Sequence, residues 1–244
     1  MSAETLHSSG CLLCGAELVY SSGDSARTCA ICGTEASANV ACSAGHYVCD
    51  SCHSTTANDL ILRVCSASSS TVPLALAMQL MESPLIKMHG PEHHYLVPAV
   101  LACAWCNVKG IPDQEKRRML ETARRRAEDV KGGFCGFLGS CGAAMGTGMF
   151  ISLVTGATPV SRSEWRLANL MTSESLRTIA EHGGPRCCKR DTFLAILSAA
   201  GFTRAHLHVD MDVEAVRCAW SPRNKECLKD ECPFYEPGAV AGAQ

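Results

Sequence analysis

Four pairs of metal-ligand residues near the start of the chain limit what this segment can fold into. The pairs are Cys11 with Cys14, Cys29 with Cys32, Cys42 with His46, and Cys49 with Cys52. A tetrahedral zinc ion takes four sulfur or nitrogen ligands, and one Cys-x2-Cys turn supplies two of them. The pairs therefore predict two zinc ions in a small module at residues 1–65, with the connectivity of the pairs left open.

The turns of this module favour a treble-clef-like zinc fold. Gly15 and Gly33 directly follow the second cysteine of their pairs, where a tight turn needs a residue that tolerates positive φ. After Cys52, apolar residues recur at helical spacing across residues 60–64. We therefore expect the last ligand pair to lie at the N-terminus of a helix.

The composition indicates a cytoplasmic chain with a sizeable core. It has 244 residues, 47% of them hydrophobic, and 17 cysteines. Residues 1–10 lack the basic and apolar regions of a secretory signal, so we expect reduced or metal-bound cysteines rather than a disulfide framework. The net charge of −2 gives no basic footprint and argues against a nucleic-acid partner.

The rest of the chain, residues 74–244, predicts a cysteine-rich α-helical domain, so the fold class is mainly α. The polar segment 66–71 marks the boundary with the zinc module. Ser161 and Asp191 have the spacing of helix N-caps, and residues 206–216 alternate weakly, as in a strand. Apolar periodicity predicts helices at 73–81, 94–107, 113–131, 161–182 and 191–201.

An uncharged stretch runs from Gly132 to Ser161. Its length would suit a membrane span, but glycines, polar residues and cysteines interrupt it, so we expect a closely packed buried helix and no membrane partner. Gly142 and Gly146 lie four residues apart and would let another backbone approach this helix.

Cysteines of the second domain predict thiol chemistry. Cys141 stands where a glycine-rich turn, which also carries Cys135, enters an apolar helix. Unpaired backbone N–H groups and the helix dipole stabilise a thiolate there, which predicts a lowered pKa and a nucleophile or metal ligand. Three basic residues flank the adjacent Cys187 and Cys188 and predict the same effect on their thiols.

Three further cysteines predict a cofactor site near the end of the sequence: Cys218, Cys227 and Cys232. Their thiolates suit either a third zinc ion or an iron–sulfur cluster, and a proline follows the last one, as in bacterial ferredoxin loops. We expect Cys141 or Cys188 to complete the ligand set, with Cys135 as a further cofactor-binding candidate.

The segment MHGPEHH at residues 88–94 brings three histidines and a carboxylate into one turn. Histidine is the usual general acid or base near neutral pH, so His93 is a catalytic candidate, with Glu92 to orient or assist it. The alternative is a polar loop whose histidines cap the following helix.

Two resemblances add family expectations. The segment Cys141-Gly142-Ala143-x-x-Gly146 resembles a redox-active cysteine family with a Gly-Cys-Ala-x-x-Gly signature. The whole chain resembles an uncharacterised family of cysteine-rich proteins, found mainly in anaerobic prokaryotes and sometimes joined to methyltransferase domains. That likeness implies a metal- or thiol-dependent task, with a methyltransferase or redox partner. It is carried by residues 45–53, 88–94, 141–144, 184–191 and 227–235.

Two functions fit these features. The first is a metal-binding protein with thiolate-based redox, sulfur or one-carbon transfer chemistry in its helical domain, whose zinc module is structural or docks a protein partner. The second is a non-catalytic adaptor with a RING-like N-terminus, in which Cys103 and Cys106 supply the last ligand pair and Cys11 and Cys14 are idle. Dinucleotide, P-loop, Gly-x-Ser-x-Gly and His-Glu-x-x-His motifs are missing from the sequence, which disfavours the common cofactor enzymes.

Overall fold

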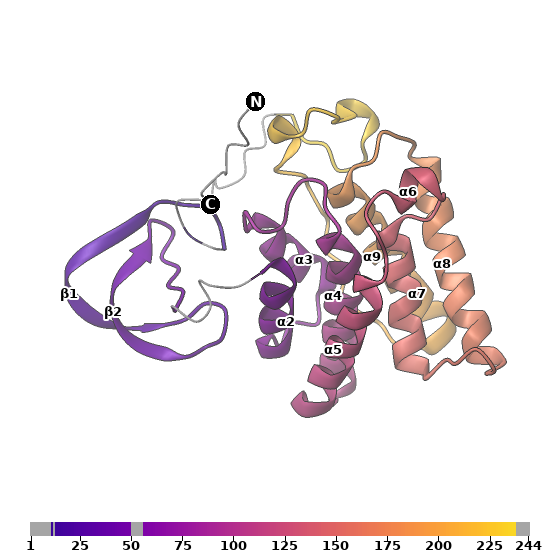
Figure 1. The fold of residues 1–244 in the computed structure, drawn as a ribbon, viewed down its shortest axis with the longest axis horizontal. Helices are drawn as coiled ribbons and strands as arrows, with labels where there is room; N and C mark the ends of the chain where they lie inside the picture. The colour runs from indigo at the N-terminus through magenta and orange to yellow at the C-terminus, as the bar shows by residue number, and fades with distance from the viewer. Residues whose placement is uncertain (1–10, 12, 50–55, 238–244) are drawn as a thin grey trace.

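The computed structural model describes residues 11, 13–49 and 56–237, and it places a β-hairpin beside a bundle of helices (Figure 1). The described part is mainly helical, which confirms the predicted fold class. Two short 3-10 helices, Ser221–Arg223 and Lys229–Glu231, follow the last α-helix. The α-helices are α2 (Ala57–Ala67), α3 (Pro73–Glu82), α4 (Glu92–Lys109), α5 (Asp113–Glu128), α6 (Phe134–Phe137), α7 (Gly142–Thr155), α8 (Ser163–Glu181) and α9 (Cys188–Leu207).

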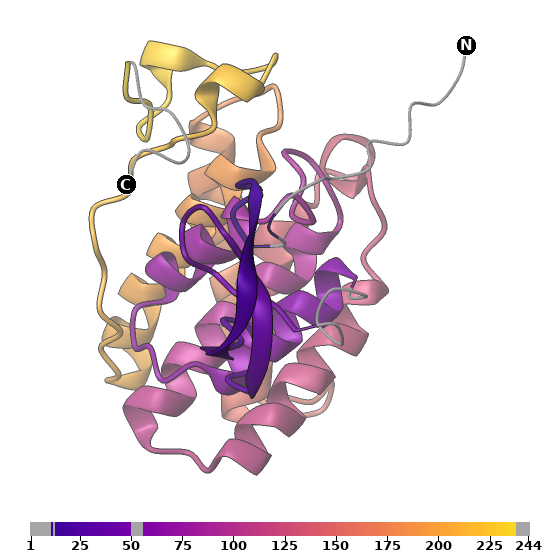
Figure 2. The same ribbon diagram turned by 90° about the vertical axis from the view of Figure 1, so that its left-hand side faces the viewer.

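The hairpin consists of strands β1 (Leu18–Thr28) and β2 (Glu35–Cys42), which pair antiparallel in front of the bundle (Figure 2). Leu18 lies opposite Cys42, and the pairing shifts between Tyr20 and Ser25. The turn between the strands carries Cys29 and Cys32. The hairpin therefore has cysteines at both of its ends, and an isolated two-stranded ribbon of this kind is marginally stable without such cross-links.

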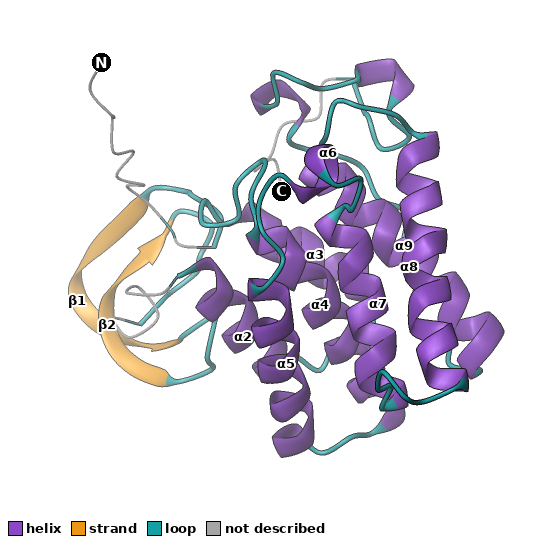
Figure 3. Cartoon of the chain, turned by 45° about the vertical axis from the view of Figure 1, so that its right-hand side comes forward, coloured by secondary structure: helices purple, strands orange, loops and turns teal. Residues whose placement is uncertain are grey.

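Helix α4 forms the centre of the bundle. It packs against α2, α3, α5, α7 and α9, and most of its residues are buried, as expected for a helix that is apolar on all sides. Helix α7 lies between α4 and α8 (Figure 3). The core therefore runs through α4 and α7. The two helices begin at the same end of the bundle, because Gly142 at the start of α7 lies against the ring of His94 in the first turn of α4.

The close approach of α4 and α7 confirms the role expected of the two glycines. A Cβ atom at Gly142 would overlap the ring of His94, and one at Gly146 would lie 2.8 Å from Cδ of Pro98. The uncharged stretch thus contains a buried helix, and no helix of the described residues combines the length and apolar character needed to cross a membrane.

Two expected helix starts are wrong. Helix α4 begins at Glu92, so Pro98 lies inside the helix rather than in its first turn. The N-cap of α8 is Arg162 and not Ser161, because Ser161 instead exchanges hydrogen bonds with Thr158. A local serine–threonine turn therefore competes successfully with the predicted capping box.

The last helix also differs from its prediction. Helix α9 starts at Cys188, so Asp191 lies in its first turn rather than at the N-cap, and the helix continues past Gly201 to Leu207. The strand predicted at 206–216 is wrong, since this segment leaves the helix through His208 in a left-handed conformation and then has no regular structure.

Helix α2 confirms the helix predicted after the N-terminal cysteines and belongs to the bundle by its contacts. It begins at Ala57, so Cys49 does not lie at its N-terminus as expected, and Cys52 is outside the described residues. Thr56 and Asp59 form a capping box at its start, and its buried face contacts α4 and α5. Arg124 of α5 forms an ion pair with Asp59, with 2.6 Å between Nη1 and Oδ1. The domain limits at 65 and 74 stay a prediction.

Candidate metal centres and a thiol-lined cavity

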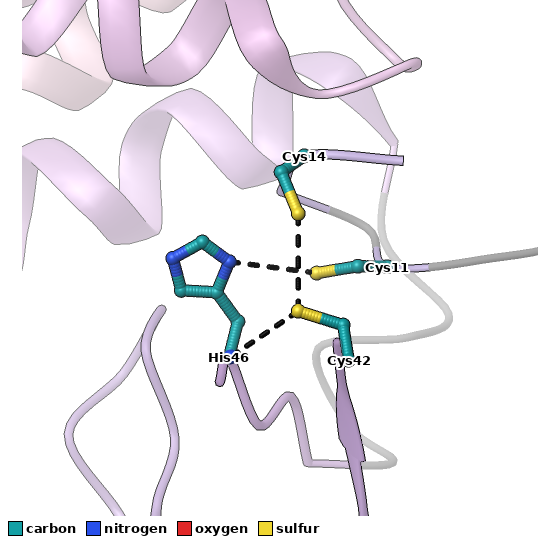
Figure 4. A group of neighbouring side chains, drawn as sticks. All are labelled: Cys11, Cys14, Cys42 and His46. Carbon is teal, nitrogen blue, oxygen red and sulfur yellow. Dashed lines mark hydrogen bonds between the residues drawn. The ribbon is translucent and has the colours of Figure 1, made fainter. Parts of the chain in front are cut away.

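The first N-terminal group joins the first and third ligand pairs. Ligand atoms of Cys11, Cys14, Cys42 and His46 all lie within 4.8 Å of one another (Figure 4). Sγ of Cys11 lies 3.9 Å from Nδ1 of His46, and Sγ of Cys14 lies 3.8 Å from Sγ of Cys42. Three sulfurs and one nitrogen at this spacing could hold a metal ion such as zinc.

The second group joins the second and fourth pairs. Ligand atoms of Cys29, Cys32 and Cys49 lie within 4.8 Å of one another, with 3.7 Å between Sγ of Cys32 and Sγ of Cys49. Cys52, the remaining predicted ligand, lies outside the described residues. The two groups are thus interleaved along the chain and stand at opposite ends of the hairpin.

These groups contradict the ligand assignment of the RING-like hypothesis. Cys11 and Cys14 are not idle, because they complete the group that contains Cys42. Cys103 and Cys106 are fully buried in α4, where Sγ of Cys103 donates to the carbonyl oxygen of Cys65 at 3.2 Å. They are core residues of the bundle and do not supply a last ligand pair.

The thiols of the N-terminal groups differ in acidity. The hydroxyl of Thr34 lies 3.3 Å from Sγ of Cys32 and is the main reason that the pKa of this thiol falls to about 6. Burial raises the pKa of the Cys11 thiol to about 12, although hydrogen bonds from the main-chain amides of Cys14 and Leu13 act in the opposite direction. Because metal ions bind thiolates, ion binding must release the Cys11 proton, and affinity at this group falls with decreasing pH.

A separate cavity of about 210 Å³ lies in the helical bundle, at the end where α4, α7 and α9 begin. Cys135 of α6, Cys141 at the N-cap of α7 and Cys188 at the start of α9 all line it. The cavity adjoins a groove of about 810 Å³, and Arg186 and Asp191 line both. Three thiols from separate segments therefore line one cavity, beside a groove that is open to solvent.

The predicted acidity of Cys141 is wrong. The amides of Ala144 and Ala143 do donate to its sulfur, as expected for a helix N-cap. Burial, with Asp191 at 4.0 Å from Sγ, outweighs them and raises the pKa of the Cys141 thiol to about 11. Burial also raises the pKa of Cys188 to about 12, so the flanking basic residues do not dominate there.

The adjacent residues Cys187 and Cys188 line different cavities. Cys188 lines the 210 Å³ cavity, whereas Cys187 lines a much smaller one of about 20 Å³. Burial raises the pKa of the Cys187 thiol to about 11, again contrary to prediction. The smaller cavity is also lined by Cys218, Cys227 and Cys232. The three C-terminal cysteines thus adjoin Cys187 and not Cys141 or Cys188, and Cys135 belongs to the other cavity.

Two catalytic candidates of the histidine turn are engaged in holding the turn together. Both ring nitrogens of His93 have partners at 3.0 Å, the hydroxyl of Thr192 and the carbonyl of Lys87. Burial lowers the pKa of His93 to about 3, so the ring is neutral at physiological pH. Glu92 accepts the amide of Lys87 at 2.8 Å. These contacts favour structural roles.

His89 is a further candidate site residue of this turn, and the sequence pattern does not single it out. It lines the cavity, and its Nε2 atom lies 3.2 Å from Oδ1 of Asn224 and 3.4 Å from Oε2 of Glu226. Its Nδ1 atom is buried and has no hydrogen-bond partner among the described residues. A buried ring nitrogen without a partner is costly, which makes His89 a candidate for contact with a bound group. The sequence offered only the presence of a third histidine.

Comparison with known proteins adds one relationship. A model described as a family of unknown function, DUF5714, matches residues 61–235. The chain belongs to this family. No curated protein and no solved structure matches it. The stretch shared with DUF5714 includes both cysteine-lined cavities and begins after the N-terminal metal groups.

Proposed function

We propose that this DUF5714 protein is a cytoplasmic metal-binding protein whose helical domain uses thiolates for redox, sulfur or one-carbon transfer chemistry. The supporting observation is the convergence of Cys135, Cys141 and Cys188 on one cavity together with the unpartnered Nδ1 atom of His89. Each comes from a different segment of the chain, so the fold and not local sequence assembles the set.

An iron–sulfur cluster is the cofactor that these donors suit. Cysteine thiolates are the usual ligands of such clusters, and histidine replaces cysteine in some of them. Burial keeps Cys141 and Cys188 protonated on their own, so a cation that displaces their protons supplies the activation that the helix N-terminus does not. In this proposal His89 acts as a ligand or hydrogen-bonds to the bound group.

The adjoining groove gives the reacting molecule its route to the thiols. Arg177 and Arg186 line it, and so does Phe137, whose side chain is 89% exposed. An anionic small molecule, or an acidic segment of a methyltransferase or redox partner, would complement these guanidinium groups. The proposal assigns this groove to the substrate and the 210 Å³ cavity to the cofactor.

The N-terminal zinc groups brace the fold in this account. A closed four-ligand zinc site leaves no coordination position for a substrate, so we assign zinc there a structural role. The two ions would tie the two ends of a hairpin that has few apolar contacts of its own.

Iron and zinc content after anaerobic purification tests the proposal. We expect iron in the wild-type protein and its loss in Cys141→Ser and Cys188→Ser, with zinc unchanged. Cys106→Ser is the control, because Cys106 is a buried cysteine of the bundle that contacts Met119 and does not line the cavity. Iron-free wild-type protein, or variants that retain all the iron, would contradict the proposal.

A second candidate function is a protein-interaction module, favoured by one feature of the hairpin. Val19 and Tyr20 on β1 are 55% and 70% exposed, although both are large apolar side chains. A partner that covers them would make the zinc module a docking element. Replacing both with serine would then abolish partner capture and leave the iron content unchanged.

A further inference from the structure

Four cysteines from two distant parts of the chain surround the 20 Å³ cavity. Cys187 precedes α9, while Cys218, Cys227 and Cys232 belong to the irregular C-terminal segment. All four are free thiols in the structure. The volume is close to that of one water-sized sphere, so it suits a single ion rather than a multi-atom cluster.

Main-chain amides donate to three of these sulfurs from a short distance along the chain. Trp220 and Ser221 donate to Cys218, Arg190 to Cys187, and Lys229 to Cys227 at 3.4 Å. The same pattern occurs in the N-terminal groups, where His46 donates to Cys42 at 3.2 Å. Hydrogen bonds of this kind stabilise thiolates and orient them toward a metal ion.

The charge around the four cysteines favours a negatively charged centre. The ammonium group of Lys189 is buried, lies 4.4 Å from the ring centre of Trp220, and donates to the main-chain carbonyls of Met81 at 3.0 Å and Ile86 at 3.4 Å. Trp220 itself lines the cavity. A zinc ion with four thiolates carries a net charge of −2, which is opposite in sign to this buried cation.

We propose that Cys187, Cys218, Cys227 and Cys232 bind one structural zinc ion that fastens the C-terminal segment to the start of α9. Among the described residues, only the N-terminal groups have their ligand atoms within 4.8 Å of one another. The sulfurs of the four cysteines around the 20 Å³ cavity are farther apart, so in this proposal they move together when the ion binds. The protein then carries a third zinc centre, within the part matched by the family model.

This centre bears on the neighbouring cavity through Asn224. Its Nδ2 atom lies 3.6 Å from Sγ of Cys187, and its Oδ1 atom lies 3.2 Å from Nε2 of His89. Fixing the segment around Asn224 therefore orients the ring of His89, a residue that lines the cavity. Such support of a functional side chain from behind is common around metal centres.

Zinc counts on the full chain, prepared with zinc as the sole added metal, test the assignment. We expect Cys218→Ser and Cys232→Ser each to lose about one zinc ion per chain, and Cys14→Ser combined with Cys218→Ser to lose about two. Cys141→Ser, in the other cavity, keeps the wild-type zinc content, so this result is separable from any failure of the proposed function. Unchanged zinc in Cys218→Ser and Cys232→Ser would overturn the assignment, as would loss of iron instead.

Alkylation of the wild-type protein provides a test that does not depend on the variants folding. With zinc bound, iodoacetamide followed by mass spectrometry should find the four cysteines protected together, and a chelator should expose all four together. Labelling of any one of them at the same rate before and after chelation would contradict a shared ion.

Discussion

Cys187 and Cys188 are consecutive in the chain, yet they line two different cavities. Cys187 is the N-cap of α9 with an extended backbone, at φ −135° and ψ 101°, and Cys188 is the first residue of the helix. Extended residues direct successive side chains to opposite sides, which separates the two thiols. One helix start therefore contributes to both the proposed zinc centre and the proposed reactive cavity.

Asp191 adds to the effect of burial on the pKa of Cys141. Its carboxylate lies 4.0 Å from Sγ, and removing the negative charge in Asp191→Asn should lower the pKa of Cys141 from about 11. A fall of about one unit would raise the thiolate fraction about tenfold below the pKa. The pH dependence of iodoacetamide labelling of metal-free protein measures this, with exposed Asp113→Asn as the control. An unchanged or higher pKa would show that Asp191 does not act on the thiol.

His93 should make the fold sensitive to acid. Its pKa falls from 6.5 in the unfolded chain to about 3 in the folded protein because the ring is buried. The unfolded state then binds the proton more readily than the folded state. The contribution of the neutral His93 ring to the free energy of unfolding is therefore fully present above pH 6.5 and decreases as the pH falls toward 3. The loss is about 1.4 kcal/mol per pH unit in this window.

Urea unfolding between pH 7 and pH 4 checks the contribution of His93. We expect His93→Gln to be less stable at pH 7 but to show a shallower decline with acid than the wild type. His206→Gln, at an exposed position of α9, serves as the control. Equal slopes for wild type and His93→Gln would mean that another group causes the acid sensitivity.

Gly146→Ala should loosen the packing of α7 on α4. The added Cβ would lie 2.8 Å from Cδ of Pro98, and overpacking of this kind costs about 1–3 kcal/mol. Gly201→Ala is the matched control, since nothing lies within 4 Å of its added Cβ and the residue is inside α9. There we expect a gain of about 0.4–1 kcal/mol in the free energy of unfolding. Equal effects of the two substitutions would contradict the close helix contact.

Removal of metal should release the hairpin before the bundle. Strands β1 and β2 have mostly exposed residues and are joined to metal-ligand groups at both ends. Hydrogen exchange with and without a chelator measures this, and we expect loss of protection in the hairpin while α4 stays protected. Hairpin amides that remain protected without metal would show that the strands are stable alone.

Helices with a clear apolar face were predictable from the sequence, whereas the hairpin was not. In α2, Leu60, Ile61 and Val64 are buried as their spacing indicates. Strands β1 and β2 consist largely of small and polar residues, so their sequences lack the alternation of apolar side chains that predicts a strand. Cysteine groups at the two ends of the hairpin, brought together by the fold, take the place of an apolar face.

The candidate site was predictable in its residue types and not in its groupings. The local sequences single out Cys141 and Cys188, but that they line one cavity with Cys135 depends on how α7 and α9 pack. Likewise, the association of Cys187 with the C-terminal cysteines is a long-range contact without a sequence signal. The acidity of Cys141 was mistaken because burial and Asp191 outweigh the helix N-terminus.

The visible absorbance spectrum of the anaerobically purified full chain tests the central claim most directly, that the cavity of Cys135, Cys141 and Cys188 holds the reactive centre. We predict a broad absorbance band at about 400 nm, as thiolate-bound iron–sulfur clusters give. This band should disappear in the Cys141→Ser, Cys188→Ser double variant. Colourless wild-type protein, or a band that persists in the folded double variant, would contradict the account.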